Sequence, residues 1–297
     1  MDDNKLLKDI VESILEERKS DKKYKFFSRS LFVLIIIFIV ISLALSTSKN
    51  VSYSNQHVAV IEISGMISSA GPVNSELILP HVENAIKNNN CIGIILKINS
   101  PGGSATQSKI IFDEINKIKS KSEKKLYAVI EDVGASGGYY IAASADKIFS
   151  SSSSIVGSIG VRLDSFNVQG LMEKLGIESQ ILSSGKDKTI LDPFSDLSDY
   201  HKIHLKKLLK SIHNQFISDI TDSRGTRISS DVFTGLFWTG IEATKIGLVD
   251  EILSIYDVTE KYFDDTQLIV YNKEDDLLKE LFKSSITFPN NIIGITY

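Results

Sequence analysis

The sequence has a single cysteine, Cys91, so neither an intrachain disulfide nor a zinc site built from several cysteines is possible. Cys91 lies within an apolar run, where a free cysteine usually serves as a small buried side chain. The cysteine content therefore leaves the redox compartment open. No residue pattern indicates a metal ion or an organic cofactor, and we expect none.

The chain also lacks an excess of positive charge, because 33 Lys and Arg are outnumbered by 37 Asp and Glu. A surface that binds a polyanion needs a basic patch, so nucleic acid is not an expected partner. Hydrophobic residues make up 42% of the sequence, which excludes disorder throughout and is enough for the core of one large domain or two smaller ones.

One stretch, residues 30–48, contains no charged residue. At a helical rise of about 1.5 Å per residue, this stretch just crosses a hydrocarbon layer of about 30 Å, which predicts one transmembrane helix. Four lysines and Arg29 occur shortly before it, whereas Lys49 is the only nearby cation after it. The positive-inside rule therefore predicts a single-pass protein of the cell (inner) membrane, with a cytoplasmic N-terminus and everything from about residue 50 on the extracytoplasmic side. A signal peptide cleaved near Ala44 is the alternative.

Predicted strands and helices alternate along the rest of the chain. Apolar runs at 57–63, 91–99 and 126–130 are typical of buried strands, and helical spacing occurs at 77–87 and 105–120. This alternation predicts an α/β fold with a largely parallel sheet and flanking helices.

Further elements are expected towards the C-terminus: helices at 139–145, 168–175, 200–220 and 275–282, strands at 147–149, 178–182 and 267–271, and a helix-turn-strand unit at 237–252. The three histidines of the 200–220 helix lie among lysines and are expected on its solvated side. The predicted division is a cytoplasmic segment 1–29, the membrane helix 30–48, a linker 49–56, a catalytic domain 57–262 and an extension 263–297.

The candidate nucleophile is Ser136. It follows an apolar strand and lies in the pattern Gly134-Ala-Ser136-Gly-Gly138, which resembles the elbow that presents a serine nucleophile. Glycines on both sides remove side chains that would block a substrate carbonyl. The alternative is a tight turn in which small residues allow a helix to pack on a sheet.

No histidine is suitably placed to act as the base for Ser136. None occurs between residues 82 and 200, and His201 follows Asp199 too closely for both to come from separate loops. A Ser-His-Asp triad is therefore disfavoured, and lysine is the known substitute. Because a lysine with an ordinary pKa of about 10.4 is almost fully charged at pH 7, the site would have to lower that pKa by about 2 to 4 units.

Five short motifs occur in an order that resembles the signal peptide peptidase A family, membrane-anchored serine peptidases of the Clp protease and crotonase superfamily. The motifs are Ser100-Pro-Gly-Gly103, Ala135-Ser-Gly-Gly-Tyr-Tyr140, Gly157-Ser-Ile-Gly-Val161, Ser184-Gly-Lys-Asp-Lys188, and Trp238-Thr-Gly240 with Gly247-Leu-Val-Asp250. The resemblance covers residues 57–262 and implies a Clp protease/crotonase-like fold.

By position, the resemblance implies that Ser136 is the nucleophile and Lys188 the general base, with Lys186 as the rival base. It also implies that Ser158 orients the lysine and that the backbone N–H groups of Gly103 and Gly137 form the oxyanion hole. The family's usual Asp after the lysine is replaced here by Thr189.

The resemblance further implies an endopeptidase that digests cleaved signal peptides or other membrane-derived, apolar peptides. It implies a homo-oligomer in which the serine and lysine of one site come from neighbouring subunits. Clp proteases carry a triad histidine in the region that reads SSSSIVGSIGV here, which contains none. A non-catalytic membrane scaffold and an acyl-CoA enzyme of the crotonase type are the remaining alternatives.

Overall fold

The computed structural model describes residues 27–39 and 55–272, in two compact units divided between Tyr53 and Ser54. Residues 27–39 form a helix with apolar, exposed side chains. The predicted transmembrane helix 30–48 extends beyond this segment into residues that lie outside those described. Within the described residues no helix has both the length and the apolar character needed to cross a membrane. The membrane helix therefore stays a prediction.

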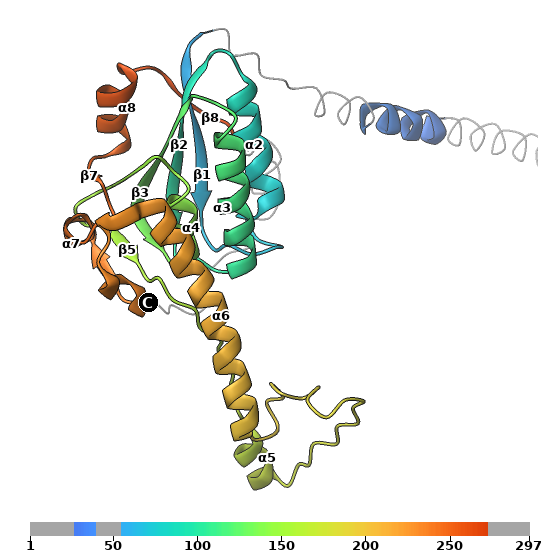
Figure 1. Ribbon diagram of the computed structural model, residues 1–297. Helices are drawn as coiled ribbons and strands as arrows, with labels where there is room; N and C mark the ends of the chain where they lie inside the picture. The colour runs from blue at the N-terminus through green and yellow to red at the C-terminus, as the bar shows by residue number, and fades with distance from the viewer. Residues whose placement is uncertain (1–26, 40–54, 273–297) are drawn as a thin grey trace, which may run out of the picture. The chain divides into compact units, whose positions relative to one another are not determined.

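The second unit is built on an eight-stranded, mostly parallel sheet (Figure 1). Its centre consists of β1 (His57–Ser64), β2 (Cys91–Ser100) and β3 (Lys125–Ala135), all parallel, and β8 (Leu268–Val270) joins β1 at one edge. The described part of the predicted C-terminal extension thus adds a strand to the sheet. The predicted α/β class with a largely parallel sheet is confirmed, and the arrangement fits a Clp protease/crotonase-like fold.

The long strand β3 has two successive partners on its other side. Its first half pairs with β4 (Lys147–Ser150), and its last residues pair with β5 (Ile155–Gly157). Strand β5 pairs in turn with β6 (Phe237–Thr239), the one antiparallel pair among the described strands, and β7 (Glu251–Ile252) pairs with β4. The carboxyl end of β3, which Ser136 follows directly, is therefore held by its neighbour β5.

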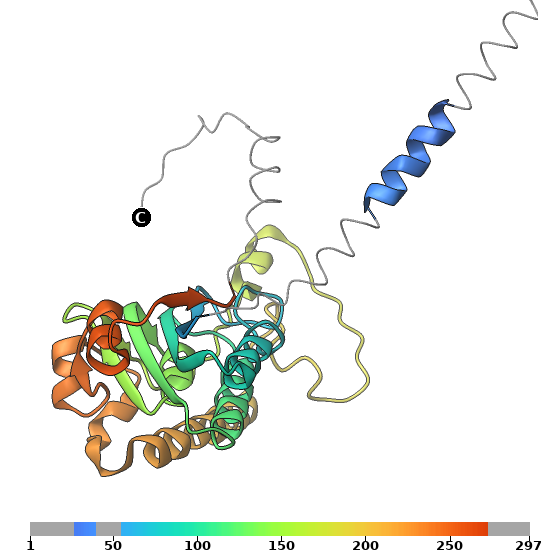
Figure 2. The ribbon, with the colours of Figure 1, turned by 90° about the horizontal axis from the view of Figure 1, so that it is seen from above.

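Helices cover both faces of the sheet (Figures 1 and 2). Helices α2 (Ser75–Lys87), α3 (Ala105–Lys119) and α4 (Gly137–Ala142) bury apolar side chains on one face, and α8 (Ile255–Phe263) packs on the other. Because side chains of a strand alternate between faces, a strand covered on both sides must be apolar almost throughout. This explains the continuous apolar run of β2.

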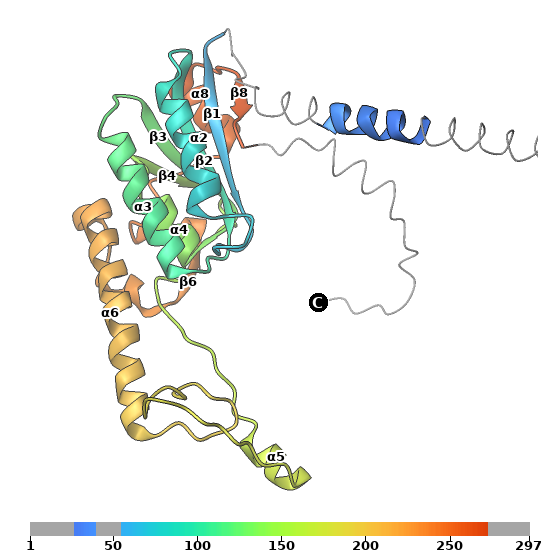
Figure 3. The same cartoon turned by 90° about the vertical axis from the view of Figure 1, so that its right-hand side faces the viewer.

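Helix α6 (Asp199–Arg224) packs on the domain only through its C-terminal half, where Phe216, Ile220 and Arg224 are buried. Its N-terminal half extends beyond the sheet, as do α5 (Gln169–Leu175) and irregular connections (Figure 3). We call residues 161–198 the arm. None of the side chains of α5 is buried.

The Gly247-Leu-Val-Asp250 motif anchors the end of α6. The Arg224 guanidinium is 2% exposed and donates to both carboxylate oxygens of Asp250 at 2.9 and 3.0 Å, while the Tyr139 hydroxyl donates to the Leu248 carbonyl at 2.8 Å. Burial raises the pKa of Asp250, but hydrogen bonds from Arg224 and from the Ile148 N–H lower it by more, so the net pKa lies below its usual value. This motif is structural.

Two expected elements differ from the structure. Residues 178–182 form no strand, because this exposed part of the arm has no neighbouring strand to pair with. The 237–252 unit begins with strand β6 rather than with a helix, since Trp238 pairs with Val156, and α7 (Gly240–Lys245) follows. Two short 3-10 helices, Gly225–Arg227 and Ser230–Thr234, connect α6 to β6. The predicted helix 275–282 lies outside the described residues.

Candidate active site

Ser136 has a strained backbone at the junction of β3 and α4. Its φ is 51° and its ψ is −118°, a conformation that is uncommon for a residue with a side chain. Two hydrogen bonds hold it: its N–H donates to the Gly157 carbonyl at 2.8 Å, and its own carbonyl accepts from the Tyr140 N–H at 2.9 Å. This strained strand-to-helix turn resembles the elbow that presents a serine nucleophile in hydrolases.

The turn after β2 lies directly against Ser136. A Cβ added to Gly102 would lie 2.7 Å from the Gly137 nitrogen and 2.8 Å from the Ser136 Cβ. The φ of Gly102 is 98°, which also favours glycine. Glycine is therefore required at 102 both for the turn and for the close approach of two backbones.

The expected oxyanion donors, Gly103 and Gly137, both line the same cavity as Ser136. Gly103 is paired with Ile67 in an isolated bridge, in which the Ile67 N–H donates to the Gly102 carbonyl and the Ser104 N–H donates to the Ile67 carbonyl. The structure thus brings the two predicted glycines and Ser136 together at one cavity.

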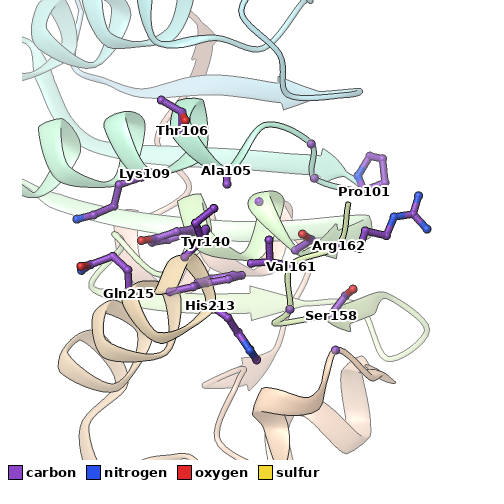
Figure 4. Close-up of a pocket in the computed structure, with 18 of the residues that line it drawn as sticks. Pro101, Ala105, Thr106, Lys109, Tyr140, Ser158, Val161, Arg162, His213 and Gln215 are labelled. Atoms are coloured by element: carbon purple, nitrogen blue, oxygen red, sulfur yellow. The ribbon is translucent and has the colours of Figure 1, made fainter. Parts of the chain in front are cut away.

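That cavity has a volume of about 1140 Å³ and lies between α3 and α6. Lys109 and Gln215 lie at one end and Ser158 and Arg162 at the other, with Tyr140 between them (Figure 4). The Tyr140 ring is stacked on Phe216, with centroids 4.2 Å apart and planes at 13°. Met66, Ile110, Val161 and Ile212 contribute apolar groups to the lining.

At the polar end of the cavity, charged and polar side chains pair with one another. The Lys109 ammonium lies 2.5 Å from Asp113 and 3.2 Å from Asp219, and the Tyr140 hydroxyl donates to Asp219. Partial burial lowers the pKa of Lys109, but the two carboxylates raise it by more, so its net pKa is above normal. Lys109 is consequently unsuited to act as a neutral base, although it lines the cavity of Ser136.

Ser158 lines the same cavity as Ser136, and its expected role in orienting a lysine stays a prediction. It has a φ of 52°, follows Gly157 with a φ of 113°, and its N–H donates to the Leu236 carbonyl at 2.7 Å. Since the Gly157 carbonyl also accepts the hydrogen bond from the Ser136 N–H, Ser136 is bonded to the residue directly before Ser158. Their relative position is therefore fixed by backbone contacts.

The structure does not bring Lys188 to Ser136 within the single chain. Lys188 and its rival Lys186 are exposed in the arm, and neither is among the residues that line the cavity. The geometry of one chain thus contains the serine, the expected oxyanion donors and Ser158, but no expected base. The Ser136–Lys188 dyad stays a prediction.

Sequence reasoning missed His213. We expected the histidines of α6 on the solvated side, but His213 is half-buried, lines the cavity, and has its Nε2 3.1 Å from the Ile159 carbonyl. His201 is also half-buried, whereas His204 is exposed as expected. The spacing of His213, Phe216 and Ile220 places all three on one helical face, and this signal could have been used.

Within the residues that the structure describes, no group of three or more His, Cys, Asp or Glu side chains is arranged to hold a metal ion. The cavity lining offers the Ser136 hydroxyl and the backbone of Gly103 and Gly137, together with titratable side chains such as His213 and the ion-paired Lys109. A serine hydroxyl beside N–H donors is an arrangement for acyl transfer.

Comparison with known proteins also indicates a peptidase. Residues 118–268 match peptidase family S49. A putative protease of Synechocystis sp., slr0021, is 31% identical over 202 residues, which cover 67% of this chain and 70% of that protein. The putative signal peptide peptidase SppA of Enterococcus faecium is 30% identical over 67% of this chain and 60% of that protein.

A third relative is the Na(+)/H(+) antiporter NhaA of Brucella melitensis, 37% identical over 186 residues. This match covers 62% of the present chain but only 25% of that protein. The chain thus matches several relatives over less than two thirds of their own length. The activities in their names are therefore properties of those relatives. The family match spans the Ser136 elbow and more than half of the sequence, so the chain belongs to peptidase family S49.

Proposed function

We propose that this protein is a serine endopeptidase whose nucleophile is Ser136. The observation that carries the proposal is the strained φ of 51° at Ser136. Ser136 follows a central strand and lies beside the Gly102 turn, and the chain belongs to peptidase family S49. Strain of this kind persists where surrounding structure enforces it and is concentrated at functional sites.

The proposed reaction uses Lys188 as the general base. The Ser136 Oγ attacks the scissile carbonyl carbon while its proton passes to the neutral Lys188 amine, and the N–H groups of Gly103 and Gly137 stabilise the oxyanion. The protonated lysine then donates its proton to the leaving amine as the peptide C–N bond breaks. Water, activated by the same amine, hydrolyses the acyl-enzyme ester and regenerates Ser136. Ser158 would orient the amine.

We further propose that Lys188 serves the Ser136 of a neighbouring subunit. Two observations support this: Lys188 does not line the cavity of its own chain, and the arm exposes many large apolar side chains. Among them, Leu182 is 101% exposed and Phe166 is 74% exposed. Apolar surface on this scale marks an interaction site, and closed rings of identical subunits repeat one such contact around the assembly.

The proposed substrates are apolar peptides left by membrane insertion or export. The apolar lining of the cavity suits an apolar side chain, and the Enterococcus faecium relative is named a putative signal peptide peptidase. Residues 30–48 would anchor the enzyme in the cell membrane, with the catalytic domain on the extracytoplasmic side, as the charge asymmetry around that stretch predicts.

Acylation of Ser136 tests the activity directly. We expect a fluorophosphonate probe to label the full-length protein in detergent, and the label to disappear in Ser136→Ala and in Lys188→Ala, with Lys186→Ala as the matched control. Equal labelling of Lys188→Ala and wild type would refute the dyad. Unchanged cellular function of Ser136→Ala would favour a scaffold. Thioester turnover without labelling would favour an acyl-CoA enzyme.

Mixing the two inactive variants tests the shared site. If the dyad forms between subunits, co-assembly of Ser136→Ala with Lys188→Ala rebuilds some sites, and we expect recovery of up to about a quarter of wild-type activity for random mixing in a ring. A dyad within one chain predicts no recovery.

A further inference from the structure

Residues 183–188, which we call the Lys188 turn, are mostly exposed. Residues 183–186 and Lys188 are exposed, and the turn is closed by backbone hydrogen bonds such as that from the Lys188 N–H to the Gly185 carbonyl at 3.1 Å. A catalytic lysine must nevertheless be held in place, because a displacement of about 1 Å can lower a rate by about 100-fold.

Two side-chain contacts join this turn to the start of α6. The Oδ1 of Asp187 lies 2.9 Å from the Nε2 of His201, and the Lys186 ammonium lies 5.6 Å from the centroid of the Tyr200 ring. His201 is the better buried partner, with a side chain that is 17% exposed against 43% for Asp187. The residue directly before Lys188 is thereby attached to a helix.

The first turn of α6 is itself well defined. The Ser198 hydroxyl accepts from the N–H of His201 at 3.2 Å and caps the helix, and the His201 ring lies 5.6 Å from the Tyr200 ring. Within residues 27–39 and 55–272, the Lys188 ammonium itself has no hydrogen-bond or ion-pair partner, whereas both Lys186 and Asp187 contact the helix. The contacts hold the turn and leave the Lys188 amine available.

We propose that His201 and Asp187 form a positioning pair that holds the Lys188 turn on α6, so that the lysine is presented in one orientation. The inference rests on the proposed role of Lys188 as the general base. His201 touches neither Ser136 nor the cavity, so it acts through the turn rather than on the substrate. The pair should consequently affect the chemical step and leave substrate binding unchanged.

Steady-state hydrolysis of an apolar peptide by the full-length oligomer tests this inference. We expect His201→Ala and Asp187→Ala each to lower kcat by about 10- to 100-fold with KM unchanged, because the base is less often correctly placed. The double variant should be no worse than either single variant, since both remove one interaction. His201→Gln keeps a side-chain N–H donor and should recover most of kcat, and His204→Gln, at an exposed position on the same helix, is the matched control.

The result separates two failures. If Lys188→Ala keeps wild-type kcat, the proposed dyad is wrong and this inference falls with it. If Lys188→Ala is inactive while His201→Ala and Asp187→Ala match His204→Gln, the dyad stands and the positioning pair is refuted. Loss of kcat in His201→Ala that His201→Gln does not restore, or additive effects in the double variant, would also refute it. Unfolding curves and oligomer size are measured for each variant, and a fall in kcat accompanied by loss of assembly counts against the inference.

Discussion

The two halves of the proposed active site are held in different ways. Ser136 follows a buried strand and is fixed by backbone hydrogen bonds and by glycines in close contact. Lys188 lies in an exposed arm, where side-chain contacts to the start of α6 attach its turn. The position of Ser136 is determined by the core of a single chain, whereas Lys188 is exposed and accessible to a second chain.

This difference indicates how activity could depend on assembly. A serine hydroxyl without a neutral base within hydrogen-bond reach is a weak nucleophile. If the base comes from a neighbour, an unassembled chain carries no complete site and cannot cleave proteins indiscriminately. Substitutions in the rigid half, by which we mean the sheet and the helices packed on it, should therefore have larger effects on stability than substitutions in the arm.

Breaking the buried ion pair should strongly destabilise the domain, whereas breaking an exposed pair should not. Arg224→Met removes the buried partner of Asp250 and leaves only the half-exposed Arg227, 2.5 Å away, so we expect the free energy of unfolding to fall by at most about 3 to 5 kcal/mol. Lys202→Ala removes an exposed pair with Asp199, and we expect a change below about 0.5 kcal/mol. Urea unfolding measures both, and similar losses would contradict the comparison.

Two glycines with the same φ of 98° provide a closely matched pair. A Cβ at Gly102 would meet the Gly137 nitrogen at 2.7 Å, but a Cβ at Gly185 in the arm would meet nothing within 4 Å. For Gly102→Ala we expect backbone strain plus overpacking, together about 3 kcal/mol of lost stability, and loss of Ser136 labelling. Gly185→Ala should cost only the strain, about 1 to 2 kcal/mol. Equal costs by urea unfolding would show that the Gly102 turn is not tightly packed.

Acid should destabilise the rigid half through Asp250. Because its folded-state pKa is lowered, Asp250 contributes stability that is fully present above its unfolded pKa of about 3.9 and is lost as the pH falls through the lower folded value. Fluorescence of Trp238, the only tryptophan, should report this loss between about pH 5 and pH 2 in urea titrations. The same acid dependence in Asp250→Asn would assign the effect to other groups.

Polar substitution in the arm should have the smallest effect on folding. Leu182 is 101% exposed, so Leu182→Ser should change the free energy of unfolding of the isolated subunit by less than about 0.5 kcal/mol while reducing assembly. Leu248→Ser, at a position that is 0% exposed, is the buried control and should cost several kcal/mol. Sedimentation measures assembly, and an unchanged oligomer in Leu182→Ser would remove this residue from the proposed interface.

Much of the fold could be predicted from local patterns. The apolar runs of β1, β2 and β3 and the helical spacing of α3 and α6 lie close to the observed elements, since each pattern reflects burial by neighbouring layers. The expected strand at 178–182 failed because its apolar residues are exposed rather than paired. Apolar alternation indicates a strand only when another strand is available beside it.

The sequence by itself determined which chemistry is available: it placed Ser136 among glycines after an apolar strand, and the positions of its histidines disfavoured a Ser-His-Asp triad. Only the tertiary structure decided which groups meet. It brought His213 and the ion-paired Lys109 to the cavity and left Lys188 outside it, because α6 crosses the domain with its C-terminal half and carries its N-terminal half beyond the sheet. Contacts between residues so distant in sequence depend on how elements pack, and no local pattern encodes them.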